Sequence, residues 1–294
     1  NQDLLALFTR WIAERKADPG EFPYALFSTY YANGYFGVHQ CTVIDSLRYA
    51  VDQCFPETDE SDKDQLQRNI CLSAMMYAAS YCVAAPGHFA QFLSFDSQRE
   101  SAHRAVFHHR SQSFLERFKD KLQDIYHHLE SSPYDNRCYA MDYRDLLSDD
   151  ELMAEVDLVY ADPPYTNVHY SRFYHILETL VRYDYPESIY IGRYRDDRHQ
   201  SGFCQKSNVE DEFRYLLRNL SSMQKTLVIS YPDTGLMPLS QLVALCKEYY
   251  SEPDQVVKES REQYVHSTLG GKTGNARKDV TEALIVCAKD KPIP

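Results

Sequence analysis

Residues 156–180 read VDLVYADPPYTNVHYSRFYHILETL, and this stretch carries the clearest structural signal in the chain. The apolar run at 156–161 predicts a strand, which leads directly into Asp162-Pro163-Pro164-Tyr165. Apolar residues then recur at helical spacing over 170–183. We therefore expect a strand, a tight turn and a helix. The turn would lie at the carboxyl end of the strand, where open α/β sheets bind ligands.

From Pro133 onward, short β-branched or aromatic runs alternate with helical patterns, which is the alternation expected of a parallel sheet. The predicted strands are residues 137–141, 156–161, 226–230, 255–259 and 283–288. The predicted helices between them are residues 170–183, 209–221 and 239–250. We assign residues 133–294 to an α/β domain.

Residues 1–132 have a different pattern. Residues 3–15 place apolar side chains on one helical face, 66–85 read as a largely buried helix, and 98–130 carry a further long helical pattern. We therefore predict that residues 1–132 form a helical lobe or insertion before the α/β domain.

Composition restricts the class of protein. The chain has 294 residues, 44% of them hydrophobic and 25% charged, which excludes a disordered or fibrous protein. No apolar run approaches the roughly 20 residues that span a bilayer. The eight cysteines include no CxxC pair, and the chain starts with no secretory apolar segment. These features predict a soluble cytoplasmic protein with reduced thiols.

The chemistry of the turn follows from its residue types. Two consecutive prolines fix φ and remove two backbone donors, so the turn offers carbonyl acceptors without competing N–H groups. Asp162 adds a carboxylate and Tyr165 a flat aromatic face. A planar amine could stack on Tyr165 and donate to Asp162 and to the carbonyl of Pro163, which leaves lone-pair density on its nitrogen. In the alternative interpretation, Asp162 caps the following helix and the prolines only end the strand.

These residues resemble a known family. The motif at 162–165 is similar to the (D/N/S)PP(Y/F/W) motif of amino-methyltransferases that use S-adenosylmethionine, and more narrowly to the D-twelve class of adenine-specific DNA methyltransferases. In that class a Tyr-rich helix like YSRFYH at 170–175 follows the motif, and a helical region like residues 35–48 precedes it. The resemblance implies methyl transfer to adenine in DNA, as in restriction–modification, on a Rossmann-like methyltransferase sheet with a helical lobe.

The resemblance also implies roles for single residues. Asp162, Pro163, Pro164 and Tyr165 would bind an adenine flipped out of the duplex, and Asp162 would also face the cofactor. Asp142, just after the strand predicted at 137–141, matches an acidic position near the adenine of the cofactor. No further general base is required, because the cofactor already activates the methyl group.

The chain departs from the family in one large respect. The family holds methionine through an FxGxG loop after its first strand, whereas none of the ten glycines here forms a GxG. If residues 137–141 are the third strand, the first two strands are missing, and they would lie between the third and fourth. We therefore expect a partial sheet. An upstream segment or a second polypeptide would complete it and carry the FxGxG loop.

The net charge of the chain is −12, which is unfavourable for binding nucleic acid, because phosphate contacts need Lys and Arg. Basic residues gather in GRYRDDRHQS at 192–201, which reads either as a backbone-contacting loop or as a solvated loop paired with Asp196 and Asp197. The candidates for contacts with nucleic acid are Tyr165, Arg172, Arg193, Arg195, Arg198 and Lys206.

No metal site is predicted. The adjacent pairs His108–His109 and His127–His128 do not point the same way on a helix, and no cysteine or carboxylate stands beside them at zinc-ligand spacing. Two alternatives to adenine methylation remain. The first is a catalytically inactive methyltransferase-like subunit that binds nucleic acid or partners in a larger complex, such as a defence complex. The second is the same chemistry on RNA or on a protein amide.

Overall fold

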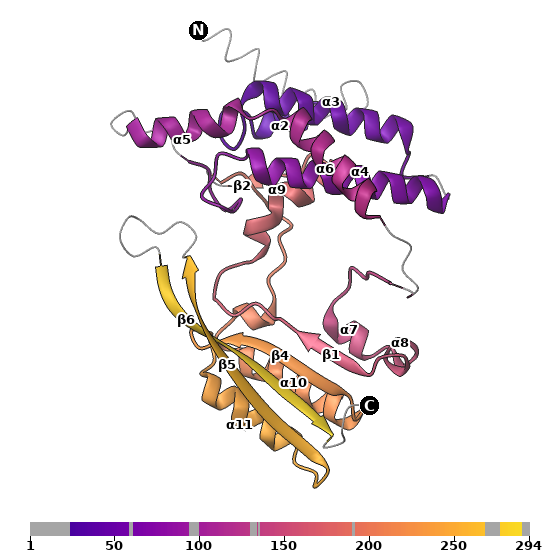
Figure 1. The fold of residues 1–294 in the computed structure, drawn as a ribbon, viewed down its shortest axis with the longest axis vertical. Coiled ribbons are helices and arrows are strands. Elements are labelled where there is room, and N and C mark those ends of the chain that lie inside the picture. Colours follow the sequence, from indigo (N-terminus) through magenta and orange to yellow (C-terminus); the bar gives the residue numbers. More distant parts are fainter. Residues whose placement is uncertain are drawn as a thin grey trace. The chain divides into compact units, whose positions relative to one another are not determined.

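The computed structural model describes residues 24–58, 61–93, 100–129, 134, 136–189, 192–267 and 277–289 (Figure 1). The chain forms two compact units, which we call the helical unit (Asn1–Ser131 and Ser171–Arg198) and the sheet unit (Ser132–Tyr170 and His199–Pro294). The sequence-based division at residue 132 places all of 133–294 in one domain, whereas residues 171–198 pack with the helical unit. The helix predicted at 3–15 lies outside the described residues.

The described part of the helical unit is built mainly of helices, as the sequence predicts for its first 130 residues. Asp62 and Asp64 stand in the first turn of its longest helix, where carboxylates interact favourably with the helix dipole. Its elements are α2 (Leu26–Tyr30), α3 (Val38–Cys54), α4 (Asp62–Cys82), α5 (Glu100–Ser111), α6 (Phe114–His128), α9 (Ser171–Arg182), β2 (Ser188–Ile189) and β3 (Tyr194–Arg195).

Helix α9, which follows the motif, is held in the core of the helical unit. Its inner side chains Ile176 and Leu180 are fully buried in one cluster with residues of α2, α3 and α4. Its last turn is capped by the buried Arg48 of α3, whose Nε and Nη2 donate to the carbonyls of Leu180 and Val181 at 3.1 and 3.0 Å. A guanidinium at this end satisfies free carbonyls and complements the helix dipole.

The segment after α9 is fixed by an ion-pair network around one buried arginine. Arg195 is 2% exposed, and its two terminal nitrogens donate to the carboxylate of Asp184 at 2.6 and 2.7 Å. Its Nε donates to Asp197 at 2.8 Å. These charge-assisted bonds tie the two ends of the loop together.

The sheet unit supplies the α/β part of the chain. The helices predicted at 209–221 and 239–250 are confirmed. Its elements are α7 (Tyr143–Leu147), α8 (Asp150–Ala154), β1 (Leu158–Ala161), the 3-10 helix η1 (Gly202–Cys204), α10 (Val209–Ser222), β4 (Thr226–Pro232), α11 (Leu239–Tyr249), β5 (Gln255–Ser267) and β6 (Arg277–Lys289).

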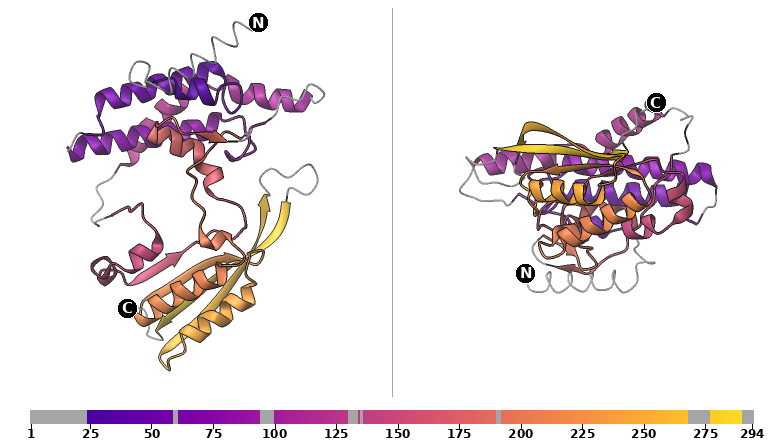
Figure 2. Two further views of the ribbon diagram at one scale, coloured as in Figure 1. Left: turned by 180° about the vertical axis from the view of Figure 1, so that it is seen from behind. Right: turned by 90° about the horizontal axis from the view of Figure 1, so that it is seen from below.

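The four strands of this unit run in the order β1-β4-β6-β5. Helices α10 and α11 lie on one face of the sheet (Figure 2), where Leu227, Ile229, Ile285 and Cys287 are fully buried. The predicted partial α/β sheet is confirmed, but it is parallel only between β1 and β4. Strand β6 runs antiparallel to both β4 and β5, so the expectation of a parallel sheet was wrong for this half.

The strand predicted at 137–141 is also wrong, because residues 136–140 have no regular structure. Among the described residues no strand lies beside this segment, and a strand cannot form without a hydrogen-bonded neighbour.

Strand β1 ends the sheet, so among the described residues its second edge has no partner strand. Two large side chains of β1 are exposed, Leu158 at 54% and Tyr160 at 58%. Tyr160 is in register with Val228, which pairs with Val286, so these residues share the face opposite the buried core. That face also carries Leu284, 42% exposed. None of the described helices is long and apolar enough to cross a membrane.

The buried Arg195 predicts a clear effect on stability. Replacing Arg195 by Gln should lower the free energy of unfolding by about 1 to 3 kcal/mol, because its charge-assisted bonds to Asp184 and Asp197 are lost and these carboxylates keep only Arg182. Replacing Arg104, whose side chain is 77% exposed and pairs with Glu100, should change it by less than about 0.5 kcal/mol. Urea unfolding followed by circular dichroism measures both. Equal effects of the two substitutions would contradict the assignment.

Candidate active site

The turn at 162–165 begins where β1 ends. The last residue pair of the parallel ladder is Ala161–Ile229, and residues 162–165 continue without regular structure. Because β1 and β4 are parallel, the turn lies at the carboxyl end of both strands, as predicted.

The aromatic end of the turn is anchored to the connection between β4 and α11. The carbonyl of Tyr165 accepts a hydrogen bond from the backbone N–H of Leu236 at 3.0 Å. The ring of Tyr165 meets the edge of Tyr170, with 6.3 Å between centroids and 75° between ring planes. Tyr165 is half-buried against the core of the sheet unit. The two prolines before it add stiffness and no N–H donors.

A second carboxylate lies near Asp162. Ser230 of β4 donates a hydrogen bond from its hydroxyl to Glu282 of β6. The Asp162 side chain is exposed, yet its pKa is raised above the ordinary value, first by partial desolvation and second by the negative charge of Glu282. The site therefore holds two interacting carboxylates, Asp162 in the turn after β1 and Glu282 on β6, the second strand along from β1.

The turn borders a cavity of about 480 Å³. Most of its wall is apolar and comes from α7 and α8, from β1, and from η1 and α10. The lining residues are Tyr143, Leu146, Leu147, Met153, Val156, Leu158, Val159, Tyr160, Ala161, Asp162, Pro163, Pro164, Ser201, Phe203 and Leu216.

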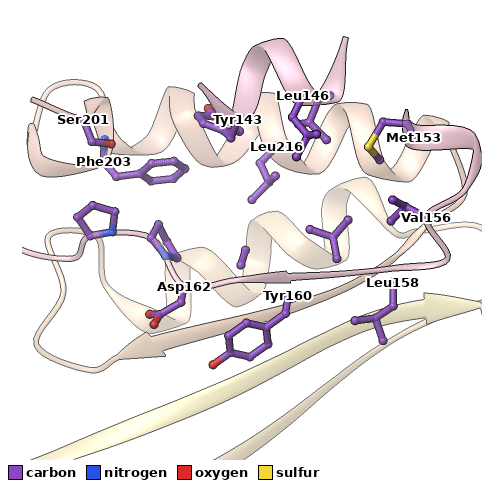
Figure 3. A pocket seen from close by; sticks show the side chains of 15 residues that line it. Tyr143, Leu146, Met153, Val156, Leu158, Tyr160, Asp162, Ser201, Phe203 and Leu216 are labelled. Carbon is purple, nitrogen blue, oxygen red and sulfur yellow. The ribbon is translucent and has the colours of Figure 1, made fainter. Parts of the chain in front are cut away.

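The close view of this cavity shows how β1 divides its lining (Figure 3). Phe203 and Leu216 lie on one side of the strand, whereas Leu158, Tyr160 and the carboxylate of Asp162 point to the other side. The cavity therefore extends around the unpaired edge of β1. Its aromatic and apolar walls suit a planar ring, with Asp162 at the rim as a polar acceptor.

Asp142 precedes the cavity residue Tyr143 in the sequence but does not itself line the cavity. It is exposed and caps α7, where its carboxylate accepts from the backbone N–H of Arg144 at 2.9 Å. The next residue, Tyr143, does line the cavity, and its hydroxyl donates to Glu212. Arg144 pairs with the same Glu212 at 2.9 Å.

The basic residues singled out in the sequence have different surroundings. The guanidinium of Arg195 is buried between Asp184 and Asp197, as described above. The half-buried Arg193 donates to the carbonyls of Tyr30 and Ala32. Both side chains therefore use their donors inside the helical unit.

The other candidates are more available. The Arg172 and Arg198 guanidinium carbons lie over the ring of Tyr194, at 5.8 and 4.7 Å from its centroid. Lys206 is exposed on the sheet unit. Tyr165 is part of the turn itself.

Sequence reasoning missed several residues of the site. Glu282 is the only charged side chain in the apolar run at 280–288, which is a detectable signal, but its nearness to Asp162 depends on strand order. Tyr143, Ser201 and Phe203 join the cavity from segments far apart in the chain. Among the described residues no group of three His, Cys, Asp or Glu side chains is placed to hold a metal ion.

Comparisons with known proteins identify a family and several similar sequences. Residues 8–230 match the family model of the D12 class N6 adenine-specific DNA methyltransferases. The chain is 27% identical over 286 residues to the modification methylase LlaI of Lactococcus lactis subsp. lactis, covering 96% of this chain and 42% of that protein. It is 25% identical over 217 residues to the type II methyltransferase M.FokI of Planomicrobium okeanokoites, covering 73% of this chain and 29% of that protein.

A third relative, the type II methyltransferase M.CviAII of Paramecium bursaria Chlorella virus 1, is 32% identical over 100 residues, 34% of this chain and 29% of that protein. The chain thus spans less than half the length of these relatives. No solved structure matches it. Since the family model covers more than half of the sequence, the chain belongs to the D12 class of N6 adenine-specific DNA methyltransferases.

Proposed function

We propose that the chain takes part in methyl transfer from S-adenosylmethionine to the exocyclic amine of adenine in DNA. The observation that carries this proposal is the position of residues 162–165. They stand at the carboxyl end of a parallel strand pair in a chain of the D12 class, and the first three of them, Asp162, Pro163 and Pro164, line an apolar cavity.

The chain's own residues would position the amine. One N–H of the target amine donates to Asp162 and the other to the carbonyl of Pro163, while the base stacks on Tyr165. Both acceptors sit on a turn whose prolines fix φ, so little reorganisation is required when the amine attacks. Asp162 must be ionised to act in this way, and its raised pKa sets the lower pH limit of activity.

The cavity is suited to hold part of the cofactor. Its walls include the aromatic rings of Tyr143 and Phe203, which suit a purine, and Asp162 stands at its rim. Asp142, next to Tyr143, is our candidate for a polar contact with the same group. Bound S-adenosylmethionine would supply a methyl group already activated on a sulfonium. The 294 residues contain no GxG to hold its methionine end.

We also propose that the open edge of β1 is completed by a strand from an upstream segment or a second polypeptide that carries the FxGxG loop. The support is the lack of a second neighbour for β1 in the described sheet, together with the exposure of Leu158 and Tyr160 on one face of this strand. An unpaired edge strand of this kind is a site for strand addition.

A second candidate function is a methyltransferase-like subunit that binds DNA or partners without transferring a methyl group. Within these 294 residues no GxG is present to hold the methionine end of a cofactor, which is the pattern that a binding subunit would show. Tight DNA binding without transfer, in the presence of every FxGxG partner tested, would select this function over catalysis.

The role of Asp162 predicts a large loss of activity. With labelled S-adenosylmethionine, duplex DNA and the FxGxG partner, Asp162→Ala should reduce methyl transfer by about 100-fold or more, because the amine loses its charged acceptor. Asp157→Ala is the matched control, since Asp157 is exposed one residue before β1. An unchanged rate for Asp162→Ala in a folded protein would rule out the proposed role.

The neighbouring carboxylate predicts a change in pH dependence. Glu282→Gln removes a negative charge that raises the pKa of Asp162, so the acid limb of kcat/KM should move to lower pH. The shift should stay below about one pH unit because Asp162 is exposed and screened. Glu151→Gln, at an exposed site on α8, should leave the profile unchanged. A limb that stays fixed or moves to higher pH would contradict the proposed coupling.

The open edge of β1 predicts protection by the partner. Amides of β1 that do not bond to β4 should exchange rapidly in the 294-residue chain and slow by about tenfold or more when the FxGxG polypeptide is added. Amides of β4, already paired on both sides, serve as the internal control. Methyl transfer without any added protection of β1 would show that the strand docks elsewhere.

A further inference from the structure

Most arginines in the described part of the helical unit bind another group of the same unit. Five pair with carboxylates: Arg48 and Arg68 with Asp52, Arg104 with Glu100, and Arg182 and Arg195 with Asp184 and Asp197. Three more donate to neutral acceptors: Arg110 to the carbonyl of Asn33, Arg193 to that of Ala32, and Arg117 to the side chain of Gln112. Each of these eight side chains thus has a partner among the described residues.

Arg172 and Arg198 are different. Within the part of the chain that the structure describes, neither has a carboxylate partner. The Arg172 Nε is buried and has no acceptor there. Arg198 spends one donor, its Nε, on the carbonyl of Arg195 at 3.0 Å. The remaining guanidinium N–H groups of both residues are available.

Both guanidinium groups gather at one aromatic ring. They lie 5.8 and 4.7 Å from the centroid of Tyr194, and Arg172 also lies 5.8 Å from the centroid of Phe173. Stacking on rings leaves the edge donors of a guanidinium free to bind an anion. Two like charges at one ring repel each other, and an anion held by both would relieve that repulsion.

The ring that carries them is held in place. The Tyr194 hydroxyl donates to the carbonyl of Ala90, and its ring packs edge-on against His175, with 5.0 Å between centroids. Burial, followed by the charges of Arg198 and Arg195, lowers the pKa of His175 to about 4, so this histidine is neutral at pH 7. The carboxylate nearest to Arg198 in sequence, that of Asp197, already accepts hydrogen bonds from Arg195 and Arg182.

We propose that Arg172 and Arg198, which lie over the ring of Tyr194, form a clamp for one backbone phosphate of DNA. A phosphodiester supplies two anionic oxygens in the geometry that guanidinium groups bind best. The choice of DNA as the source of the phosphate rests on the proposed function. In the sequence, Arg172 stands seven residues after Tyr165, and Arg198 stands three residues before Ser201, which lines the cavity.

The test is equilibrium binding of a short fluorescein-labelled DNA duplex by the 294-residue chain, followed by anisotropy between about 0.05 and 0.2 M salt. Arg172→Gln and Arg198→Gln should each weaken binding about tenfold and reduce the salt slope by about one. The double variant should lose less than the sum of the two, because both side chains hold the same phosphate. Arg172→Lys should keep the slope and lose part of the affinity.

Arg104→Gln is the matched control, an exposed arginine of the same unit that already has a carboxylate partner. Its affinity and slope should equal those of the parent chain. Folded Arg172→Gln and Arg198→Gln variants that match Arg104→Gln would overturn the clamp, as would fully additive losses in the double variant. The assay measures DNA binding and contains no S-adenosylmethionine. Its result therefore does not depend on whether the chain transfers a methyl group or on the proposed role of Asp162.

Discussion

The site depends on the parallel pairing of β1 with β4. Four residue pairs, from Leu158–Thr226 to Ala161–Ile229, fix the point at which the chain leaves the sheet. A slip of one residue would exchange the two faces of β1 and turn Asp162 away from Glu282. The same register places Val159 and Ala161 on the buried side and leaves Leu158 and Tyr160 exposed. The position of the motif and the exposed side chains of the edge strand are therefore both set by these four residue pairs.

Much of the fold can be read from the sequence because its signals are local. Helical periodicity predicted α9, α10 and α11 to within one or two residues at each end, and apolar runs located β1, β4, β5 and β6. Strand direction and the absence of a strand at 137–141 depend on partners distant in sequence. The same is true of α9, whose buried Ile176 and Leu180 look equally suited to pack on a sheet or among helices.

The candidate site divides in the same way. Asp162, Pro163, Pro164 and Tyr165 are contiguous, so their chemistry can be read directly. The basic cluster at 192–201 cannot be read so simply, because Asp184, outside the cluster, binds Arg195. The same stretch of sequence thus contains Arg195, which is used in ion pairs, and Arg198, which still has free donors to bind an anion. The two arginines can be told apart only from the groups that they contact in the structure. Glu282 was missed because strand order alone brings it near the turn.

Because residues 171–198 belong to the helical unit, the protein cannot be truncated at a single position between its two units. A piece cut at residue 133 would retain α9 but lose α2, α3 and α4, against which Ile176 and Leu180 are buried. It would also lose Arg48, leaving the terminal carbonyls of that helix without their donor. Such a piece would carry, in the middle of its chain, an uncapped helix with exposed apolar side chains. The two units are intertwined in sequence, and neither can be excised with a single cut.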